Sequence, residues 1–231
     1  MSDLDDSTTL LTVNHLSAWY GRAKALFDLS FEVKKGEVVA LMGVNGAGKS
    51  TTLKAIMNMM DRKEGQVIFN GQDISKAPSY QIARAGLGFV PEDRRVFSEL
   101  TVKENLLTGR QPERYWPDGE AVFYWTEERL YQLFPNLGKM VHRPGGKMSG
   151  GEQQMLSVAR SLMGNPYMVL LDEPSEGVAP VIVDQMIEMI IELKKKGISI
   201  LISEQNYHLA KQVADRYYTL SMGEIVEEGV L

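Results

Sequence analysis

The sequence predicts an α/β fold with a mixed sheet, and three observations support this prediction. Residues 43–50 read Gly-Val-Asn-Gly-Ala-Gly-Lys-Ser and match the pattern G-x-x-x-x-G-K-[ST] at every fixed position. An apolar run at 37–42 precedes them, typical of a strand buried on both faces, and 51–60 continues without Gly or Pro as a helix. Further apolar runs at 167–171 and 198–203 indicate more such strands. Strand, glycine loop and helix in this order indicate a phosphate-binding loop.

Composition and charge narrow the class of protein. The 231 residues suffice for one large α/β domain, residues 1–231, with a single nucleotide site. The formal net charge of −5 argues against nucleic acid as a partner, and the lack of cysteine excludes disulfides and thiolate metal sites. No apolar stretch reaches the roughly 18 residues of a membrane-spanning helix, and residues 1–9 read as a disordered acidic leader rather than a signal peptide. We therefore expect a soluble, cytoplasmic protein.

The N-terminal part alternates in the manner of antiparallel strands. Two alternating runs, 11–20 and 25–33, are separated by a turn, and a later run ends in the Asn-Gly turn at 70–71. Tyr20 ends the first run, where its ring could stack on a planar ligand, although a strand tyrosine is more often part of a core. The predicted antiparallel β subdomain comprises residues 10–36 and 64–75.

The glycine loop has the chemistry of a polyphosphate site. Its glycines let the backbone approach the phosphates, so that successive N–H groups and the helix N-terminus point at the anion. Lys49 would bridge the β- and γ-phosphates, and Ser50 would place its hydroxyl on Mg²⁺. The alternative is a glycine-rich turn that binds nothing, and the full pattern in its full context disfavours it.

Carboxylates follow two of the predicted strands. After the strand at 167–171, Asp172 can hold the coordination sphere of Mg²⁺, and Glu173 can reach a water. This is the Walker B arrangement, and the glycine loop makes it a strong signal, whereas paired acids alone would be a weak one. Glu92 follows the strand at 87–91, where α/β sheets bind ligands, although a solvated loop charge is the commoner explanation.

Residues from about 98 to 160 are predicted to form an inserted helical subdomain. Its aromatic-rich segment at 115–125 is consistent with either a satellite core or an exposed contact surface. Near its end, Ser149 and Glu152 form an S-x-x-E capping box at the start of a helix. The pair Gly150-Gly151 costs that helix about 1 kcal/mol per residue, and bare backbone there is useful if an anion must come close.

With these motifs in this order, the chain resembles an ATPase of the ATP-binding-cassette (ABC) family over nearly its whole length. Residues 148–152, Met-Ser-Gly-Gly-Glu, look like the signature sequence of that family. Two subunits of such ATPases close head to tail, so that each ATP lies between one phosphate-binding loop and the other subunit's signature helix. The resemblance implies a P-loop NTPase fold, ATP and Mg²⁺ as cofactors, an adenine stacked on Tyr20 and an attacking water polarised by Glu173.

The resemblance also implies three groups of site residues. Nucleotide contacts are expected from Tyr20, Gly43, Asn45, Gly46, Ala47, Gly48, Lys49, Ser50 and Thr51, and in the facing subunit from Ser149, Gly150, Gly151 and Glu152. Catalytic roles fall to Glu173, Lys49, Glu92 and Gln205, and metal contacts to Ser50, Asp172 and Glu92. Three positions depart from the family pattern: Glu92 replaces the Q-loop glutamine, Ala179 the D-loop aspartate and Gln205 the switch histidine. Gln205 cannot take a proton as histidine could.

The segments around these departures, at 90–97, 172–180 and 204–206, resemble ATPase subunits of branched-chain amino acid importers. This resemblance implies as partners a membrane permease docked near 92–97, a second ATPase subunit that is identical or related and, indirectly, a solute-binding protein. The chain would then lie peripherally on the inner face of the cell membrane. Closely similar subunits serve urea or short-chain amide uptake. One alternative class is a non-transport cassette module, which is disfavoured because the sequence has one cassette, no cysteine and no long heptad run. The other is a small-molecule kinase, which would leave the signature sequence unexplained.

Overall fold

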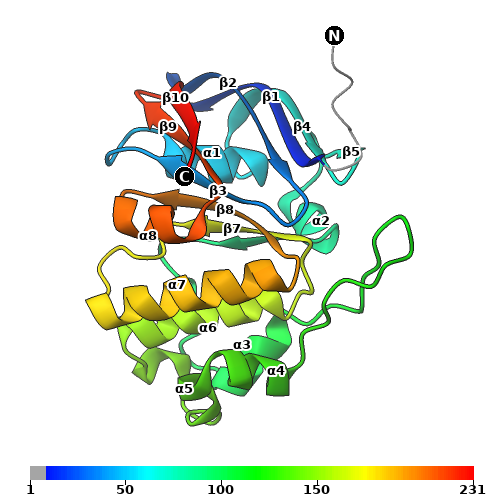
Figure 1. The fold of residues 1–231 in the computed structure, drawn as a ribbon, viewed down its shortest axis with the longest axis vertical. Helices are drawn as coiled ribbons and strands as arrows, with labels where there is room; N and C mark the ends of the chain where they lie inside the picture. Colours follow the sequence, from blue (N-terminus) through cyan, green and yellow to red (C-terminus); the bar gives the residue numbers. More distant parts are fainter. Residues whose placement is uncertain (1–8) are drawn as a thin grey trace.

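The computed structural model describes residues 9–231 (Figure 1). Its strands are β1 (Thr9–Tyr20), β2 (Ala23–Lys34), β3 (Val38–Met42), β4 (Arg62–Phe69), β5 (Gln72–Asp73), β6 (Leu87–Val90), β7 (Met168–Asp172), β8 (Ser199–Glu204), β9 (Arg216–Ser221) and β10 (Glu224–Val230). Its helices are α1 (Lys49–Ile56), α2 (Ser79–Arg84), α3 (Val102–Thr108), α4 (Glu127–Leu133), α5 (Pro135–Gly138), α6 (Gly150–Leu162), α7 (Pro180–Lys195), α8 (Tyr207–Val213) and a 3₁₀ turn at Gly145–Lys147. The predicted leader at 1–9 lies outside the described residues except for Thr9, which begins β1.

Two sheets form the framework. The antiparallel sheet has the strand order β2-β1-β4-β5, and the mixed sheet has the order β10-β9-β3-β8-β7-β6. In the mixed sheet β9, β3, β8, β7 and β6 are parallel, and only β10 at the edge is antiparallel. The predicted mixed sheet and N-terminal antiparallel sheet are therefore confirmed.

The mixed sheet is covered on both faces, which explains its continuous apolar strands. Every residue of β3, β7 and β8 is buried. Because side chains alternate along a strand, Val38 and Ala40 belong to the core shared with α6 and α7. Val39 and Leu41 belong to the core shared with α1 and the antiparallel sheet. Each fully buried side chain of this kind contributes about 1.5–3 kcal/mol.

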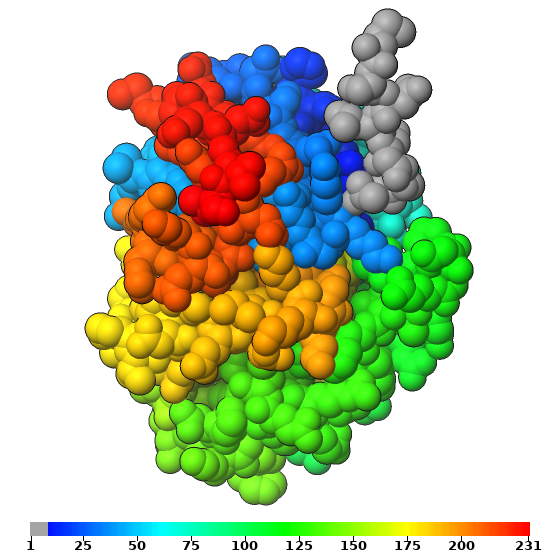
Figure 2. Space-filling view, in the orientation of Figure 1, coloured from blue at the N-terminus to red at the C-terminus, as the bar shows by residue number. Residues whose placement is uncertain are grey.

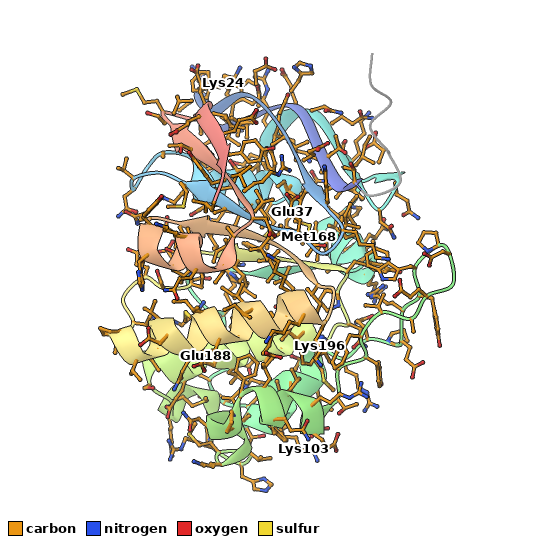
Figure 3. The ribbon with its side chains drawn as sticks, in the orientation of Figure 1. Lys24, Glu37, Lys103, Met168, Glu188 and Lys196 are labelled. Carbon is orange, nitrogen blue, oxygen red and sulfur yellow. The ribbon has the colours of Figure 1, made fainter. Side chains whose placement is uncertain are left out.

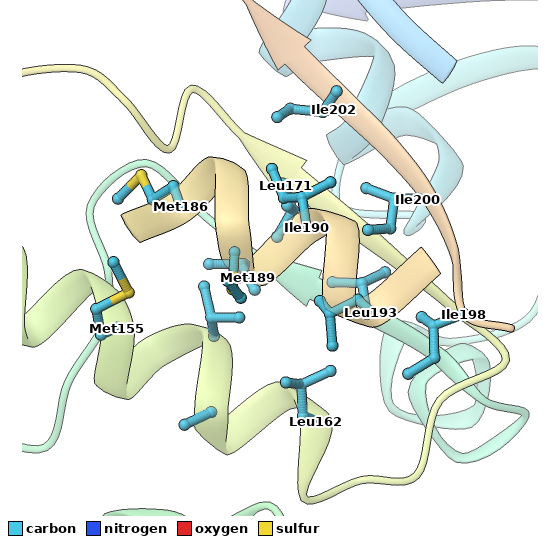
Figure 4. Packing of buried hydrophobic residues seen from close by; sticks show 14 of the residues in the cluster. Met155, Leu162, Leu171, Met186, Met189, Ile190, Leu193, Ile198, Ile200 and Ile202 are labelled. Atoms are coloured by element: carbon cyan, nitrogen blue, oxygen red, sulfur yellow. The ribbon is translucent and has the colours of Figure 1, made fainter. Parts of the chain in front are cut away.

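Helices α6 and α7 form a layer beneath the mixed sheet (Figures 1 and 4). Met155 and Leu162 of α6 face Met189 and Leu193 of α7, and α7 in turn packs on Ile200 of β8 (Figure 4). Helices α3, α4 and α5 lie beyond this layer, farthest from the antiparallel sheet (Figure 1). The predicted inserted helices are thus present between β6 and β7.

The aromatic segment at 115–125 contributes to the cores rather than to an open surface. It belongs to the loop between α3 and α4, which stands at one edge of the molecule (Figure 2). The Trp116 ring is 9% exposed and packs on Tyr167, with ring centroids 4.6 Å apart. Trp125 is 3% exposed and packs on Phe123, with centroids 4.8 Å apart. Trp116 and Trp125 thus join the two main cores, whereas Tyr115 is exposed, so the segment forms neither a separate satellite core nor a continuous exposed surface.

Glu37 links the two sheets at the middle of the molecule (Figure 3). It lies between β2 and β3, and its Oε1 accepts a hydrogen bond from Arg216 Nε of β9 at 2.6 Å. Arg216 Nη2 also donates to the carbonyl oxygen of Glu32 in β2 at 3.1 Å. Within residues 9–231, no helix is long and apolar enough to cross a membrane.

Candidate active site

Three parallel strands end side by side at one edge of the mixed sheet. Met42 ends β3, Glu204 ends β8 and Asp172 ends β7. Strand β8 lies between the other two, with Glu204 paired to Met42 and Ser203 paired to Asp172. The glycine loop and the two carboxylates therefore meet at this edge, as ligand-binding residues do in open α/β sheets.

The conformation of the loop requires its glycines. Gly43 has φ +151°, and a Cβ there would lie 2.6 Å from the carbonyl oxygen of Leu220. Gly48 has φ +110° and stands at the N-cap of α1, where a Cβ would lie 3.0 Å from Leu26 Cδ2. No side chain caps α1, so its first N–H groups are left for an acceptor outside the helix, such as a phosphate.

Lys49 is buried in the loop with its ammonium group fully used. The side chain is 2% exposed, and Nζ donates to the carbonyl oxygens of Gly43 at 2.8 Å and Val44 at 3.1 Å. Nζ also lies 3.0 Å from Glu173 Oε1, which is itself only 8% exposed. A buried pair of this kind needs further hydrogen bonds to offset its desolvation, and the two carbonyls supply them.

Asp172 is held by a serine from the neighbouring strand. Ser203 Oγ donates to Asp172 Oδ1 at 2.8 Å. Burial raises the pKa of the Asp172 carboxyl, while the hydroxyls of Ser50 and Ser203 act in the opposite sense. Asp172 Oδ2 is buried and has no hydrogen-bond partner within residues 9–231. A buried oxygen of this kind, with Ser50 close by, is suited to a cation of the hard, oxygen-preferring type.

Glu173 stands in a strained, hydrogen-bonded position. Its φ is +43°, its main-chain N–H donates to Ser203 Oγ at 3.0 Å, and its Oε2 accepts from Gln205 Nε2 at 2.8 Å. Burial raises the pKa of Glu173, but hydrogen bonds from Glu176, Lys49 and Gln205 outweigh it and leave the pKa lowered. The hydrogen bond with Glu173 raises the pKa of Glu176 to about 7. Glu173 is therefore the more acidic of the two carboxyls.

Gln205 and Tyr20 also lie at the loop. Gln205 Nε2 donates to Asn45 Oδ1 at 2.6 Å, so this side chain bridges the phosphate-binding loop and Glu173. The Tyr20 ring is 51% exposed, and its hydroxyl lies 3.3 Å from Thr51 Oγ1 of α1. An exposed ring fixed beside the loop is available for stacking on a base.

Two predicted groups do not join this cluster. Glu92 is exposed and makes no hydrogen bond or ion pair within the described part of the chain, although its charge contributes to the raised pKa of Glu176. Ser149 forms the predicted capping box with Glu152 at the start of α6. No hydrogen bond or ion pair among residues 9–231 joins Ser149, Gly150, Gly151 or Glu152 to the phosphate-binding loop.

Sequence reasoning missed two residues of β8. Ser203 contacts both predicted acidic residues, and Glu204 accepts hydrogen bonds from Ser175 Oγ at 2.9 Å and from the N–H of Gln205 and Asn206, both at 3.1 Å. Glu204 thereby ties the segment after Glu173 to the end of β8. The available signal was the pair Ser203-Glu204 directly after the apolar run at 200–202.

A glycine loop on β3, an adjacent lysine and paired carboxylates on β7 define a P-loop nucleoside triphosphatase. The sequence profile of the ABC transporter family matches residues 26–176. The chain belongs to this family, and it is an ATPase that binds and hydrolyses ATP. ATPases of the family act as dimers with membrane permease subunits.

Individual relatives are similar over nearly the whole chain. The branched-chain amino acid transport ATP-binding protein BraG of Pseudomonas aeruginosa is 42% identical over 94% of this chain and 91% of its own length. The lipopolysaccharide export ATP-binding protein LptB of Haemophilus influenzae is 31% identical over 96% of this chain and 90% of its own. The solved ADP conformation of MJ1267, an ATP-binding cassette of an ABC transporter, matches with a TM-score of 0.80 and 30% identity, covering 96% and 91% of the two chains. These similarities confirm the predicted fold class and ATPase activity.

Proposed function

We propose that this chain is the ATP-hydrolysing subunit of an importer for branched-chain amino acids. The observation that supports this most directly is the 42% identity to BraG across 94% of the chain, against 31% to LptB. The role places the chain on the inner face of the cell membrane, below permease subunits that receive the amino acid from a solute-binding protein.

The geometry supports the assignment of roles within the site. The N-terminus of α1 and Lys49 bind the phosphates, with Lys49 Nζ exchanging its contact to Glu173 for a phosphate oxygen. The exposed ring of Tyr20 stacks on adenine. Glu173 accepts a proton from the attacking water, because it is the buried carboxylate whose lowered pKa keeps it ionised. Gln205 holds Glu173 Oε2 toward the loop at Asn45.

Mg²⁺ fits the residues present. Asp172 Oδ2 is a buried oxygen without a partner among residues 9–231, and the Ser50 hydroxyl is close to the same carboxyl. When bound, the ion would neutralise phosphate charge that develops as the γ-phosphate is transferred. Glu92 remains a proposed contributor, because a carboxylate on the loop after β6 could reach the ion when the loop moves.

Two chains are proposed to enclose each ATP, the phosphate-binding loop of one facing Ser149 to Glu152 of the other. The Glu173→Gln variant tests this arrangement by light scattering with and without ATP and Mg²⁺, alongside phosphate release by the wild-type chain. We expect an ATP-dependent dimer for the variant, and a loss of hydrolysis of about 10²–10⁴-fold, typical for a general base. A variant that binds ATP and stays monomeric would show that the partner is a different ATPase subunit or that the head-to-tail arrangement is wrong.

A groove beside the 92–97 loop is the proposed permease site. It has a volume of about 540 Å³ and lies between α2, β6, the loop and the C-terminal part of α6. Its exposed aromatic side chains, Tyr80 and Phe97, are 57% and 51% exposed. Such side chains anchor protein interfaces. Replacing Tyr80 and Phe97 by Ala should abolish co-purification with the permease, and unchanged co-purification would rule out this surface.

Transport assays test the identity of the solute. Uptake of labelled leucine should require both the wild-type chain and its permease, and should be lost with Glu173→Gln. Unlabelled isoleucine and valine should compete, whereas urea and acetamide should not. Competition by urea or acetamide alone would assign the chain to urea or short-chain amide uptake.

A further inference from the structure

The two glycines of the signature segment are each covered by a side chain of the same molecule. A Cβ on Gly150 would lie 2.9 Å from Nη1 and 3.4 Å from Cζ and Nη2 of Arg94. A Cβ on Gly151 would lie 2.9 Å from Cγ1 of Ile182. The first turn of α6 is therefore not simply bare backbone, because the guanidinium of Arg94 occupies the space that Gly150 leaves.

Arg94 is fixed in this place by α6 itself. Arg94 and Arg95 are both in the left-handed region, with φ +61° and +46°, which costs non-glycine residues about 1–3 kcal/mol each unless the surroundings impose it. Arg160, near the end of α6, donates to the carbonyl oxygens of Arg94 at 3.2 Å and Arg95 at 2.7 Å. The helix thus holds the turn through Arg160 and receives the Arg94 side chain at its first residue.

The stability of α6 does not explain the position of Arg94. A cation at a helix N-terminus is unfavourable by about 0.3–1 kcal/mol. Arg94 makes no ion pair within residues 9–231, and its Nε is buried without a hydrogen-bond partner there. Arg95, one residue further, is exposed and paired with Asp93 at 3.1 Å. The chain therefore keeps an unpaired guanidinium against the one helical turn that is proposed to meet ATP across the dimer.

We propose that Arg94 is a positioning residue for the signature segment, and that Gly150 is glycine because the Arg94 guanidinium must lie against it. This inference rests on the proposed head-to-tail dimer. Arg94 sets the first turn of α6 against the 91–97 loop, so that Ser149 and Gly151 present a fixed surface to the ATP held by the facing subunit. Loss of Arg94 then weakens closure of the dimer without changing ATP binding by a single chain.

The test uses the full chain in the Glu173→Gln background, with ATP-dependent dimerisation measured by light scattering. Arg94→Ala should raise the protein concentration at half-dimerisation by about tenfold, the scale of coupling between contacting residues. Arg94→Lys should recover part of it, since the ammonium keeps the charge but not the planar contact. Arg95→Ala is the matched control, removing the same charge from the same turn, and should dimerise as the parent does. Binding of a fluorescent ATP analogue by the monomer should be equal in all four.

Gly150→Ala distinguishes this role from a direct phosphate contact by bare backbone. If the glycine exists to receive Arg94, Gly150→Ala should weaken dimerisation as Arg94→Ala does, and the double variant should be no worse than either single one. Additive losses would overturn the inference, as would dimerisation of Arg94→Ala at the parent concentration.

If the Glu173→Gln parent does not dimerise, hydrogen exchange at the main-chain amides of Glu152 and Gln153 tests the role of Arg94 in the monomer. Their N–H groups donate to Ser149 Oγ at 3.3 Å and to the Ser149 carbonyl oxygen at 2.9 Å, so they report the order of the first turn. Both amides should exchange several-fold faster in Arg94→Ala than in Arg95→Ala. Equal rates would refute the role of Arg94, whereas a monomeric parent with the expected exchange would refute only the homodimer.

Discussion

Replacing Ser203 by Ala removes a single hydroxyl group but should disturb the active site strongly. The Ser203 hydroxyl donates to Asp172 Oδ1 at 2.8 Å and accepts from the N–H of Glu173 at 3.0 Å. All three residues are buried, so water cannot replace the lost bonds. The N–H of Glu173 keeps a second acceptor, the Ser203 carbonyl oxygen at 3.1 Å, which moderates one of the two losses.

The expected destabilisation follows from these bonds. A hydrogen bond to a charged group contributes about 1.5–3 kcal/mol and a neutral one about 0.5–1.5 kcal/mol, so the free energy of unfolding should fall by about 2–4 kcal/mol. The hydroxyl also lowers the pKa of Asp172 against the effect of burial. Its removal should raise that pKa further and increase the Mg²⁺ concentration needed for half-maximal ATP hydrolysis.

Ser199→Ala provides the matched control. Ser199 lies in the same strand and is equally buried, but its hydroxyl accepts from the N–H of Gly36 at 2.8 Å, at the opposite end of β8. Urea unfolding should show a loss of about 1 kcal/mol for Ser199→Ala and an unchanged Mg²⁺ requirement. Equal losses of stability in the two variants, together with equal Mg²⁺ requirements, would refute the account of Ser203.

Three further predictions follow from the same geometry. Tyr20→Ala should weaken ATP binding about tenfold, because the stacking of the ring on adenine is lost. Tyr20→Phe should bind ATP nearly as tightly as wild type, since the contact between the Tyr20 hydroxyl and Thr51 is long, at 3.3 Å. Equilibrium binding of labelled ATP checks both variants. Folding raises the pKa of Glu176 from 4.5 to about 7, so the folded state binds a proton at Glu176 more tightly than the unfolded state does. The resulting stabilisation is complete below pH 4.5 and is lost as the pH rises through 7. Melting temperatures of Glu176→Gln should accordingly vary less between pH 5 and 7 than those of wild type, and parallel curves would contradict the raised pKa of Glu176. Gly65→Ala should destabilise the protein far more than Gly71→Ala. Both residues have positive φ, but a Cβ at Gly65 would lie 2.4 Å from the carbonyl oxygen of His15, whereas a Cβ at Gly71 would meet no atom within 4 Å. Urea unfolding of the two variants compares their stabilities.

The parts of the fold that follow local rules were predictable from the sequence. The phosphate-binding loop, the buried strands and the Ser149–Glu152 capping box each depend on residues close together in the chain, and their patterns are strong. The order of the strands in the sheet is a tertiary property. No local pattern shows that β8 lies between β3 and β7, and therefore none shows that Ser203 contacts both acidic residues.

The aromatic segment and the signature glycines show the same limit. Whether Trp116 is exposed depends on Tyr167, which lies far along the chain and packs on its ring. The cost of Gly150 in a helix was visible in the sequence, but its neighbour Arg94 was not, because the left-handed turn that brings the guanidinium there is imposed by Arg160. The burial of Trp116 and the surroundings of Gly150 depend on residues far away in the chain, and local secondary-structure propensities carry no information about such contacts.

The placement of β6 beside β7 has a consequence for how this chain can vary. The excursion from residue 91 to residue 167 leaves the sheet at Val90 and returns at Met168, on strands paired directly to each other through Leu87 with Met168 and Val90 with Leu171. Because the two strands are parallel, the excursion leaves at the carboxyl end of β6 and returns at the amino end of β7, so its two ends are anchored on neighbouring strands of one sheet. Lengthening a flexible loop within it costs only about 0.6 kcal/mol for each doubling. Insertions and deletions in its loops can reshape the outer surface of the molecule while the strand ends that carry the phosphate-binding loop, Asp172 and Ser203 keep their register. Within this excursion, only the signature turn at 149–152 would have to keep its place, because the proposed head-to-tail dimer brings it to the ATP of the facing subunit.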